Sequence, residues 1–238
     1  MAGARSAFFA GVRRQLPILL GVAPFGAIYG ALAVGAGLAP TAAQAMSTIV
    51  FAGSSQFIAA SLFGTGAPWV VIVLTTFVVN LRHALYSASL APYVAHLPLR
   101  WKLPLAYLLT DEAYAVVIQH YRSGDNPALA HWFYAGGGLA LWTTWQVSTA
   151  AGVFFGAHVP ASWGLDFTLA LTFIALLVPS LRDRPTLLAA TVAAVVAILV
   201  GDLPYKLGLL LAAAAGIVAG VIGGRWGGAA TPITEAQP

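Results

Sequence analysis

The feature that most constrains this chain is a long apolar run, residues 68–95, with the polar segment 80–83 (Asn-Leu-Arg-His) at its middle. A helix that crosses a membrane needs roughly 20 apolar residues at about 1.5 Å of rise each, so the run predicts one spanning helix with a polar waist. Arg82 would then lie near the bilayer midplane, where a charge costs at least ~2.5–3.5 kcal/mol and is usually paired, hydrated or functional. The alternative interpretation is two helices, 67–81 and 84–97, each too short to cross unaided.

The composition indicates a polytopic membrane protein. Hydrophobic residues make up 60% of the 238 residues and charged residues only 8%, whereas soluble domains carry roughly 25% charged residues. We therefore predict an all-α bundle of membrane helices, some of them broken at the midplane. Cysteine is absent, which excludes disulfides and cysteine metal sites. The net charge of +4 resides mostly in the N-terminus and loops and does not indicate nucleic-acid binding. We expect no metal and no cofactor.

The apolar runs predict eight spans, with seven as the alternative because the segment 185–200 is short. The predicted spans are 15–38, 42–64, 68–95, 101–121, 131–157, 164–181, 185–200 and 203–224. The first run exceeds signal-peptide length and lacks a clear cleavage site, so we expect it to be retained. Residues 1–14 are then a basic cytoplasmic N-terminus, 15–226 the transmembrane domain, and 227–238 a disordered C-terminal tail.

The basic residues predict the orientation, because cytoplasmic loops of membrane proteins are enriched in Lys and Arg. With the N-terminus in the cytoplasm, the cytoplasmic side receives Arg5, Arg13, Arg14, Arg122, Arg182, Arg184 and Arg225. The outer side receives Arg100, Lys102 and Lys206. The excess favours cytoplasmic N- and C-termini, although Arg100 and Lys102 oppose it locally.

Polar or helix-breaking residues lie near the centre of each of the first five predicted spans. These clusters are Pro24, Phe25 and Gly26; Gly53, Ser54, Ser55 and Gln56; Asn80, Arg82 and His83; Thr110, Asp111 and Glu112; and Thr143, Thr144, Trp145 and Gln146. Polar groups at membrane depth must face protein or water rather than lipid. Five clusters at one depth therefore predict a shared internal cavity.

The first two clusters each allow two interpretations. Pro24 removes a helix hydrogen-bond donor and Gly26 loosens the same turn, which favours either a broken helix of the kind that binds substrate in transporters or a simple proline kink. The hydroxyls and amide at 53–56 are either interhelical hydrogen-bonding groups or cavity lining. Four small or polar residues in succession favour the lining.

Asp111 and Glu112 are adjacent, so on a helix their side chains point about 100° apart and cannot both face one cavity squarely. We expect one to pair with Arg82 or His83 and the other to face water or substrate, an arrangement suited to proton exchange. The alternative is a static buried ion pair. Histidine titrates near neutrality, so His83 is a candidate for proton movement or a hydrogen-bonding strut.

Trp145 and Gln146 in the fifth span are candidates for an apolar wall and a polar contact, or for ordinary core packing. No enzyme is predicted. The chain has no phosphate-binding loop and no zinc-ligand spacing, and a set made of Ser54 or Ser55 with His83 and Asp111 has no spacing that selects an intramembrane hydrolase.

The clusters together resemble the AzlC family, the large subunits of bacterial branched-chain amino-acid exporters. The matching motifs, in order, are Pro24-Phe25-Gly26, Phe51-Ala52-Gly53-Ser54-Ser55-Gln56-Phe57, Asn80-Leu81-Arg82-His83, Leu109-Thr110-Asp111-Glu112-Ala113-Tyr114 and residues 142–149. The resemblance covers residues 10–225. It implies an inner-membrane permease that exports leucine, isoleucine, valine and sometimes methionine, together with a small membrane partner of the AzlD type.

We therefore hypothesise a proton-coupled exporter of small apolar amino acids. The expected substrate-binding residues are Pro24, Phe25, Gly26, Gly53, Ser54, Ser55, Gln56, Phe57, Asn80, Arg82, Trp145 and Gln146, and the expected proton-coupling residues are His83, Asp111 and Glu112. Arg82 would hold the carboxylate, and Asp111 or Glu112 the ammonium or the proton. Phe25, Phe57 and Trp145 would enclose the side chain. The alternatives are a non-transporting membrane scaffold or assembly subunit and an uncoupled channel for small solutes.

Overall fold

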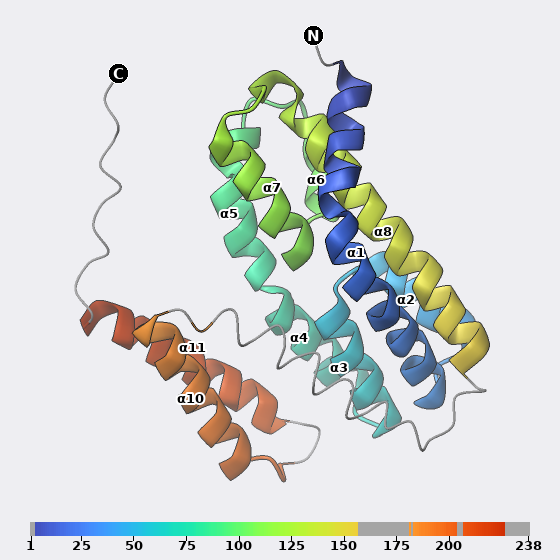
Figure 1. Cartoon of the computed structure of the whole chain (residues 1–238). Coiled ribbons are helices and arrows are strands. Elements are labelled where there is room, and N and C mark those ends of the chain that lie inside the picture. The colour runs from blue at the N-terminus through green and yellow to red at the C-terminus, as the bar shows by residue number, and fades with distance from the viewer. Residues whose placement is uncertain (1–2, 157–180, 182, 204–206, 227–238) are drawn as a thin grey trace. The chain divides into compact units, whose positions relative to one another are not determined.

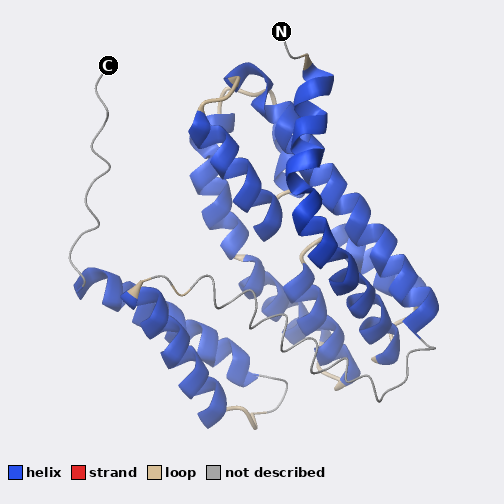
Figure 2. Ribbon diagram, in the orientation of Figure 1, coloured by secondary structure: helices blue, strands red, loops and turns tan. Residues whose placement is uncertain are grey.

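The structure is a computed structural model that describes residues 3–156, 181, 183–203 and 207–226. Over these ranges the chain forms helices and turns without any strand (Figures 1 and 2). The chain divides into two compact units, Met1–Leu165 and Asp166–Pro238. The all-helical prediction is therefore confirmed for the described part of the chain.

The first helix, α1 (Ala4–Gly35), continues without interruption through Pro17 and Pro24. Its 32 residues span about 48 Å, which exceeds the roughly 30 Å hydrocarbon core of a bilayer. The broken helix that Pro24 suggested does not form, and Pro24 lies on the exposed side of α1. Among the described residues, α1 and the stretch Trp69–Val94 are long and apolar enough to cross a membrane.

The helix α8 (Ala130–Phe155) packs along α1 in the most extensive helix contact of the first unit. Glycines let the two backbones touch. An added Cβ at Gly11 would lie 2.0 Å from the carbonyl oxygen of Phe133, and one at Gly152 would lie 2.0 Å from that of Ala27. Small residues allow membrane helices to approach this closely. The α1–α8 pair is therefore a firm wall against which the other helices of the unit are arranged.

Each of the next three predicted spans consists of two shorter helices. They are α2 (Pro40–Val50) with α3 (Gly53–Gly64), α4 (Trp69–Asn80) with α5 (Arg82–Val94), and α6 (Leu99–Tyr107) with α7 (Asp111–Ser123), after which the 3-10 turn η1 (Pro127–Leu129) leads into α8. The predicted helix over 68–95 is interrupted only at Leu81, whose φ and ψ (−56° and −24°) remain helical. The element bounds agree with the two-helix alternative, but Trp69–Val94 is still one stretch long enough to cross a membrane.

The interruptions have local causes in the backbone. Phe51 ends α2 in the left-handed region, with φ of 40°, and Ala52 is extended before α3 begins. Thr110 is also extended (φ −129°, ψ 174°), and its side-chain oxygen accepts a backbone N–H three residues on, which is the N-cap bond that starts α7. At Leu81 a single turn residue separates α4 from α5.

As a result, three of the described helices begin at predicted polar clusters. Gly53, Arg82 and Asp111 are the first residues of α3, α5 and α7. Figure 1 shows the junction of α4 with α5 and the start of α7 near the middle of the unit, with the long pair α1 and α8 alongside. The helix interruptions therefore set the place of the site.

The second unit contains a packed pair of helices, α10 (Arg184–Leu199) and α11 (Leu207–Trp226). They correspond to the predicted spans 185–200 and 203–224. An added Cβ at Gly216 would lie 2.9 Å from the Cβ of Ala193, and one at Gly220 would lie 3.2 Å from the Cβ of Ala189. Gly216 and Gly220 thus serve packing within this pair.

Two other predicted segments, most of the span 164–181 and the tail 227–238, lie outside the described residues.

Candidate functional site

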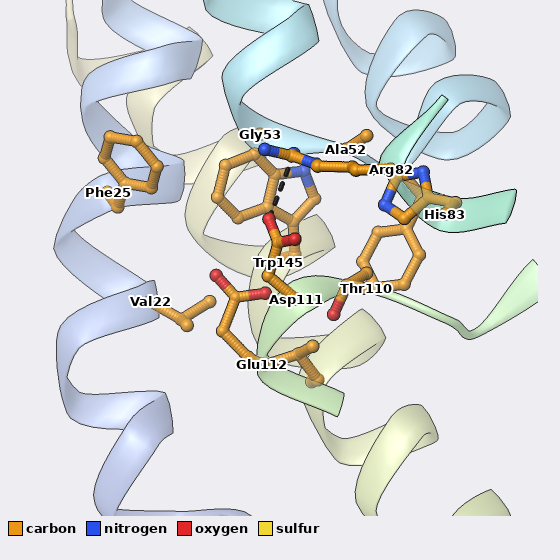
Figure 3. Close-up of a pocket in the computed structure, with 12 residues that line it drawn as sticks. Val22, Phe25, Ala52, Gly53, Arg82, His83, Thr110, Asp111, Glu112 and Trp145 are labelled. Atoms are coloured by element: carbon orange, nitrogen blue, oxygen red, sulfur yellow. Dashed lines mark ion pairs between the residues drawn. The ribbon is translucent and has the colours of Figure 1, made fainter. Parts of the chain in front are cut away.

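A cavity lies where the helix interruptions of the first unit meet (Figure 3). Its wall is contributed by Val22 and Phe25 of α1, by Phe51, Ala52 and Gly53 at the start of α3, by Arg82 and His83 of α5, by Thr110, Asp111 and Glu112 at the start of α7, and by Leu141 and Trp145 of α8. Each of the five predicted clusters supplies at least one of these residues. The volume of the cavity is about 30 Å³, enough for one or two water molecules.

An ion pair between Arg82 and Asp111 crosses the cavity and joins α5 to α7. The guanidinium Nη2 lies 3.0 Å from Oδ2 of the carboxylate, and the two side chains are 30% and 36% exposed (Figure 3). The same Nη2 donates a hydrogen bond to the hydroxyl of Ser54 at 2.5 Å. Arg82 therefore links the first turns of α3, α5 and α7.

The carboxylate of Asp111 has a second partner that the motifs did not single out. Tyr86 donates its hydroxyl to Oδ1 of Asp111 at 2.6 Å. The Tyr86 ring stacks on the ring of Tyr114, with centroids 4.5 Å apart, and the Tyr114 hydroxyl pairs with that of Ser89 at 2.9 Å. Tyr86 follows Arg82 by four residues on α5, so helical spacing could have placed it beside the pair.

Three helix N-termini, those of α3, α5 and α7, lie at the cavity, next to the C-terminal ends of α2, α4 and α6. Each helix carries roughly half a positive charge at its N-terminus, and α3, α5 and α7 begin at residues that line the cavity or are bonded to one that does. Both Asp111 and Glu112 line the cavity, which corrects the expectation that only one faces it squarely. The physical reason is that they occupy the first turn of α7, where the cavity surrounds the end of the helix rather than one side of it.

An aromatic wall closes the side of the cavity formed by α1 and α8. Phe25 and Trp145 line the cavity, and Phe57 stacks on Phe25 from behind, with ring centroids 4.6 Å apart. The indole N–H of Trp145 donates to Oε1 of Gln56 at 3.2 Å, and that oxygen also accepts the backbone N–H of Ala52 at 3.2 Å. Gln56 thus couples the aromatic wall to the interruption before α3.

Several buried polar atoms close to the interruptions have no hydrogen-bond partner within the described ranges. They are Nε2 of Gln56, Oδ1 of Asn80, Nε of Arg82 and Nε2 of His83. Buried polar groups are normally satisfied by protein, by ordered water or by a ligand. Of these four residues, Arg82 and His83 line the cavity, whereas Gln56 and Asn80 do not.

Some predicted site residues serve the packing around the cavity instead. Gly26 contacts α8, where an added Cβ would lie 2.1 Å from the hydroxyl oxygen of Ser148. Ser55 is buried and donates to the carbonyl of Ala52 at 2.9 Å. Neither these two residues nor Pro24 lines the cavity.

Gln146 also lies away from the cavity wall, in a polar contact between α2 and α8. Its Oε1 accepts bonds from Gln44 at 2.8 Å and from the hydroxyl of Thr48 at 3.0 Å. Helical spacing explains the difference, because Trp145 and Gln146 are neighbours and point to different sides of α8.

The sequence motifs missed part of the apolar wall. Val22 and Leu141 line the cavity, and nothing distinguishes them in the sequence from other apolar residues of the same spans, whereas Phe51 belongs to a quoted motif but was not named as a site residue. Thr110 had a usable signal, because a threonine directly before two acidic residues is typical of a helix N-terminus.

The chain was compared with known proteins. The family model described as AzlC protein matches residues 17–159, which include every residue of the cavity wall. The inner membrane protein YgaZ of Escherichia coli is 27% identical over 79% of this chain and 80% of its own length. An uncharacterized membrane protein of Archaeoglobus fulgidus is 30% identical, covering 80% of this chain and 84% of its own.

A third relative carries a functional name. The branched-chain amino acid transport protein AzlC of Bacillus subtilis is 29% identical over 73% of this chain and 67% of its own length. No solved structure matches the chain. The family match covers more than half of the chain and the relatives align over most of it, so this chain belongs to the AzlC family of membrane transport proteins.

Proposed function

We propose that the chain exports small apolar amino acids, foremost the branched-chain ones, through the bacterial inner membrane in exchange for protons. The observation that carries the proposal is the Arg82–Asp111 pair, set among three helix N-termini and beside an aromatic wall. Support for the substrate comes from the name of the Bacillus subtilis relative, and support for the membrane from that of the Escherichia coli relative.

Arg82 is the group that binds the substrate carboxylate in this proposal. A guanidinium matches a carboxylate in charge and in its paired donors. In the structure the carboxylate of Asp111 already pairs with Arg82, with Oδ2 at 3.0 Å from Nη2. The substrate carboxylate therefore competes with Asp111 and takes its position.

The rest of an amino acid has partners around the same cavity. Glu112 lines it and supplies a negative group for the ammonium. Phe25 and Trp145 offer apolar ring faces to an aliphatic side chain, and burial of such a side chain contributes about 1.5–3 kcal/mol. An apolar pocket with few polar groups at fixed positions is the usual form of a small-molecule site.

The described state is closed to such a substrate. The cavity volume of about 30 Å³ holds one or two waters, so an amino acid requires the site to widen. The interruptions at Phe51–Ala52, Leu81 and Leu108–Thr110 are where half-helices can change direction. Opening at these junctions would admit the substrate, and closing would seal it from water.

Proton movement follows from the same competition. A charged group within a membrane protein is stabilised by a partner, and Asp111 loses its partner when the substrate binds Arg82. The substrate ammonium then keeps Asp111 ionised, and only after the substrate has left does a proton displace Arg82 from Asp111, so the site returns protonated and releases the proton before the next substrate binds. His83 and Glu112 also line the cavity and take part in passing the proton. One substrate thereby moves against one proton.

Orientation and partner complete the proposal. The N-terminus lies in the cytoplasm, which the basic residues Arg5, Arg13 and Arg14 favour, and the chain acts with a small membrane subunit of the AzlD type. Copurification of a tagged chain with such a subunit from the same membrane tests the partner. Recovery of the chain alone under conditions that preserve transport would contradict it.

The function is tested with radiolabelled leucine in inside-out vesicles, with and without a pH gradient. We expect accumulation that depends on the gradient and is abolished by Arg82→Gln, because the carboxylate then has no cation to bind. Arg100→Gln is the control, since Arg100 is exposed on α6. Membrane yield and thermal unfolding confirm that both variants fold. Normal leucine accumulation by Arg82→Gln would refute the assignment, and gradient-independent flux would identify a channel.

A further inference from the structure

A second and larger hollow opens between α1, α7 and α8. Figure 1 shows the start of α1, the end of α7 and the start of α8 at the end of the unit that holds the N-terminus. Its volume is about 790 Å³, and it is open to the outside. Arg13 and Arg14 line it from α1, and Gln119 and Ser123 line it from α7. Polar side chains thus surround a space large enough for an amino acid with its water.

The floor of this hollow reaches almost to the central cavity. On α7, Val116 lines the hollow and Glu112 lines the cavity, and these residues are one helical turn apart, about 6 Å. On α1, Pro17 lines the hollow and Val22 the cavity, about 7.5 Å apart along the helix. Val116 and Val22 are only 9% and 7% exposed. The partition between the two spaces is therefore short and apolar.

The charges of the hollow favour an anionic group. Arg13 and Arg14 are exposed at its edge, and the opposing carboxylate, Asp125, accepts a hydrogen bond from Ser123 at 3.1 Å. His120 also lines the hollow, with its ring stacked on a phenylalanine. Two arginines against one carboxylate leave a positive excess, and a cleft of one sign raises the local concentration of ligands of the other sign.

We infer that this hollow is the vestibule through which the amino acid reaches the central cavity from the face of the membrane that holds the N-terminus. Arg13 and Arg14 bind the carboxylate of the incoming substrate. Val116 and Val22 form an apolar plug between the hollow and the central cavity, and these two side chains must move apart to let the substrate pass. The inference rests on the proposed function for the identity of the ligand. The hydration of the vestibule, its charge and its apolar plug can be tested without a transport measurement.

Cysteine labelling tests the vestibule directly, because the natural chain contains no cysteine. Single variants Gln119→Cys and Ser123→Cys in the full-length chain should react with a charged, membrane-impermeant methanethiosulfonate reagent from the face that holds an N-terminal tag. Ile118→Cys is the matched control, since Ile118 precedes Gln119 on the same helix and is buried. Val116→Cys should react about tenfold more slowly than Gln119→Cys, because the plug excludes water.

Reagents of opposite charge then test the arginines. Relative to a free thiol, the anionic reagent should label Gln119→Cys about tenfold faster than the cationic one. Adding Arg13→Gln and Arg14→Gln should remove this preference and, in vesicles, raise the KM for leucine about fivefold at an unchanged turnover. Arg82→Gln should leave the labelling preference intact.

The outcomes separate this inference from the proposed function. No labelling at Gln119 and Ser123, as expected if lipid fills the hollow, or labelling from the opposite face, would overturn the vestibule even if leucine transport is normal. Labelling without a charge preference would overturn the role of the arginines. Labelling as expected in a chain that does not bind leucine would overturn the proposed substrate and keep the hydrated path.

Discussion

Replacing Asp111 by asparagine should strengthen substrate binding while abolishing coupled transport. The substitution keeps the shape of the side chain but removes the charge that competes with the substrate for Arg82. Two charges 3.0 Å apart interact by about 5.5 kcal/mol at an effective dielectric constant near 20. Because the side chains are 30% and 36% exposed, and exposed pairs contribute only about 0.2–1 kcal/mol, about 2 kcal/mol is a reasonable net value. Its loss lowers the Kd for leucine about 25-fold.

Binding of radiolabelled leucine to purified protein measures the first effect, and proteoliposomes measure the second. Asp111→Asn should still exchange internal for external leucine, because that half-reaction needs no proton, but it should not accumulate leucine against a pH gradient. Asp202→Asn is the control, since Asp202 is exposed in the second unit. Weaker binding by Asp111→Asn, or accumulation equal to that of the natural protein, would refute the competition between Asp111 and substrate.

Three further substitutions test the surroundings of the site. Tyr86→Phe removes the hydroxyl bonded to Asp111. Because a hydrogen bond to a charged group contributes about 1.5–3 kcal/mol, gradient-driven leucine transport should slow about tenfold while leucine exchange persists. Equal slowing of transport and exchange would show a merely structural role for Tyr86. Phe25→Ala removes an aromatic ring from the apolar wall and so enlarges the space for the substrate side chain. Competition assays should show a shift of preference toward larger apolar amino acids. An unchanged preference would exclude Phe25 from the side-chain pocket. Gly152→Val places a side chain against the α1 backbone, where an added Cβ lies 2.0 Å from a carbonyl oxygen, and should prevent accumulation of folded protein. Gly21→Val is the control, because a Cβ at Gly21 meets nothing within 4 Å. Similar yields of the two variants would contradict the close α1–α8 contact.

Some of the side chains that meet at the cavity were predictable from the sequence. A charge in an apolar run has few stable options, so Arg82 had to find an acidic or polar partner, and the structure pairs it with Asp111. The aromatic residues Phe25 and Trp145 were identified because they lie beside polar clusters at the same predicted depth. Charge and membrane depth therefore constrain which side chains meet, even before the helices are placed.

The helix interruptions were harder to predict. Leu81 carries no signal for a turn, and Phe51 adopts a positive φ that non-glycine residues rarely take. These conformations are held by tertiary contacts, such as the bond from the Ala52 N–H to Gln56. Pro24 misled in the other direction, because it predicted a break in α1 where the helix in fact continues. Local propensity is overridden where partners from other helices satisfy the backbone.

The direction in which individual side chains point could also not be predicted from the sequence. Gln146 belongs to a predicted cluster but bonds Gln44 on α2, whereas Tyr86 was not singled out and bonds Asp111. A one-residue step on a helix turns a side chain by about 100°, so Trp145 and Gln146 within α8 face different sides, whereas Asp111 and Glu112 at the start of α7 both line the cavity. Only the packing of the neighbouring helices decides which member reaches the cavity.

The most direct measurement for this account is an experimental structure of the full-length chain with leucine bound. The account predicts the leucine carboxylate on the guanidinium of Arg82, the aliphatic side chain against Phe25 and Trp145, and Asp111 withdrawn from Arg82. Leucine bound elsewhere, or bound in this cavity with the Arg82–Asp111 pair still at about the 3.0 Å of the closed state, would contradict it.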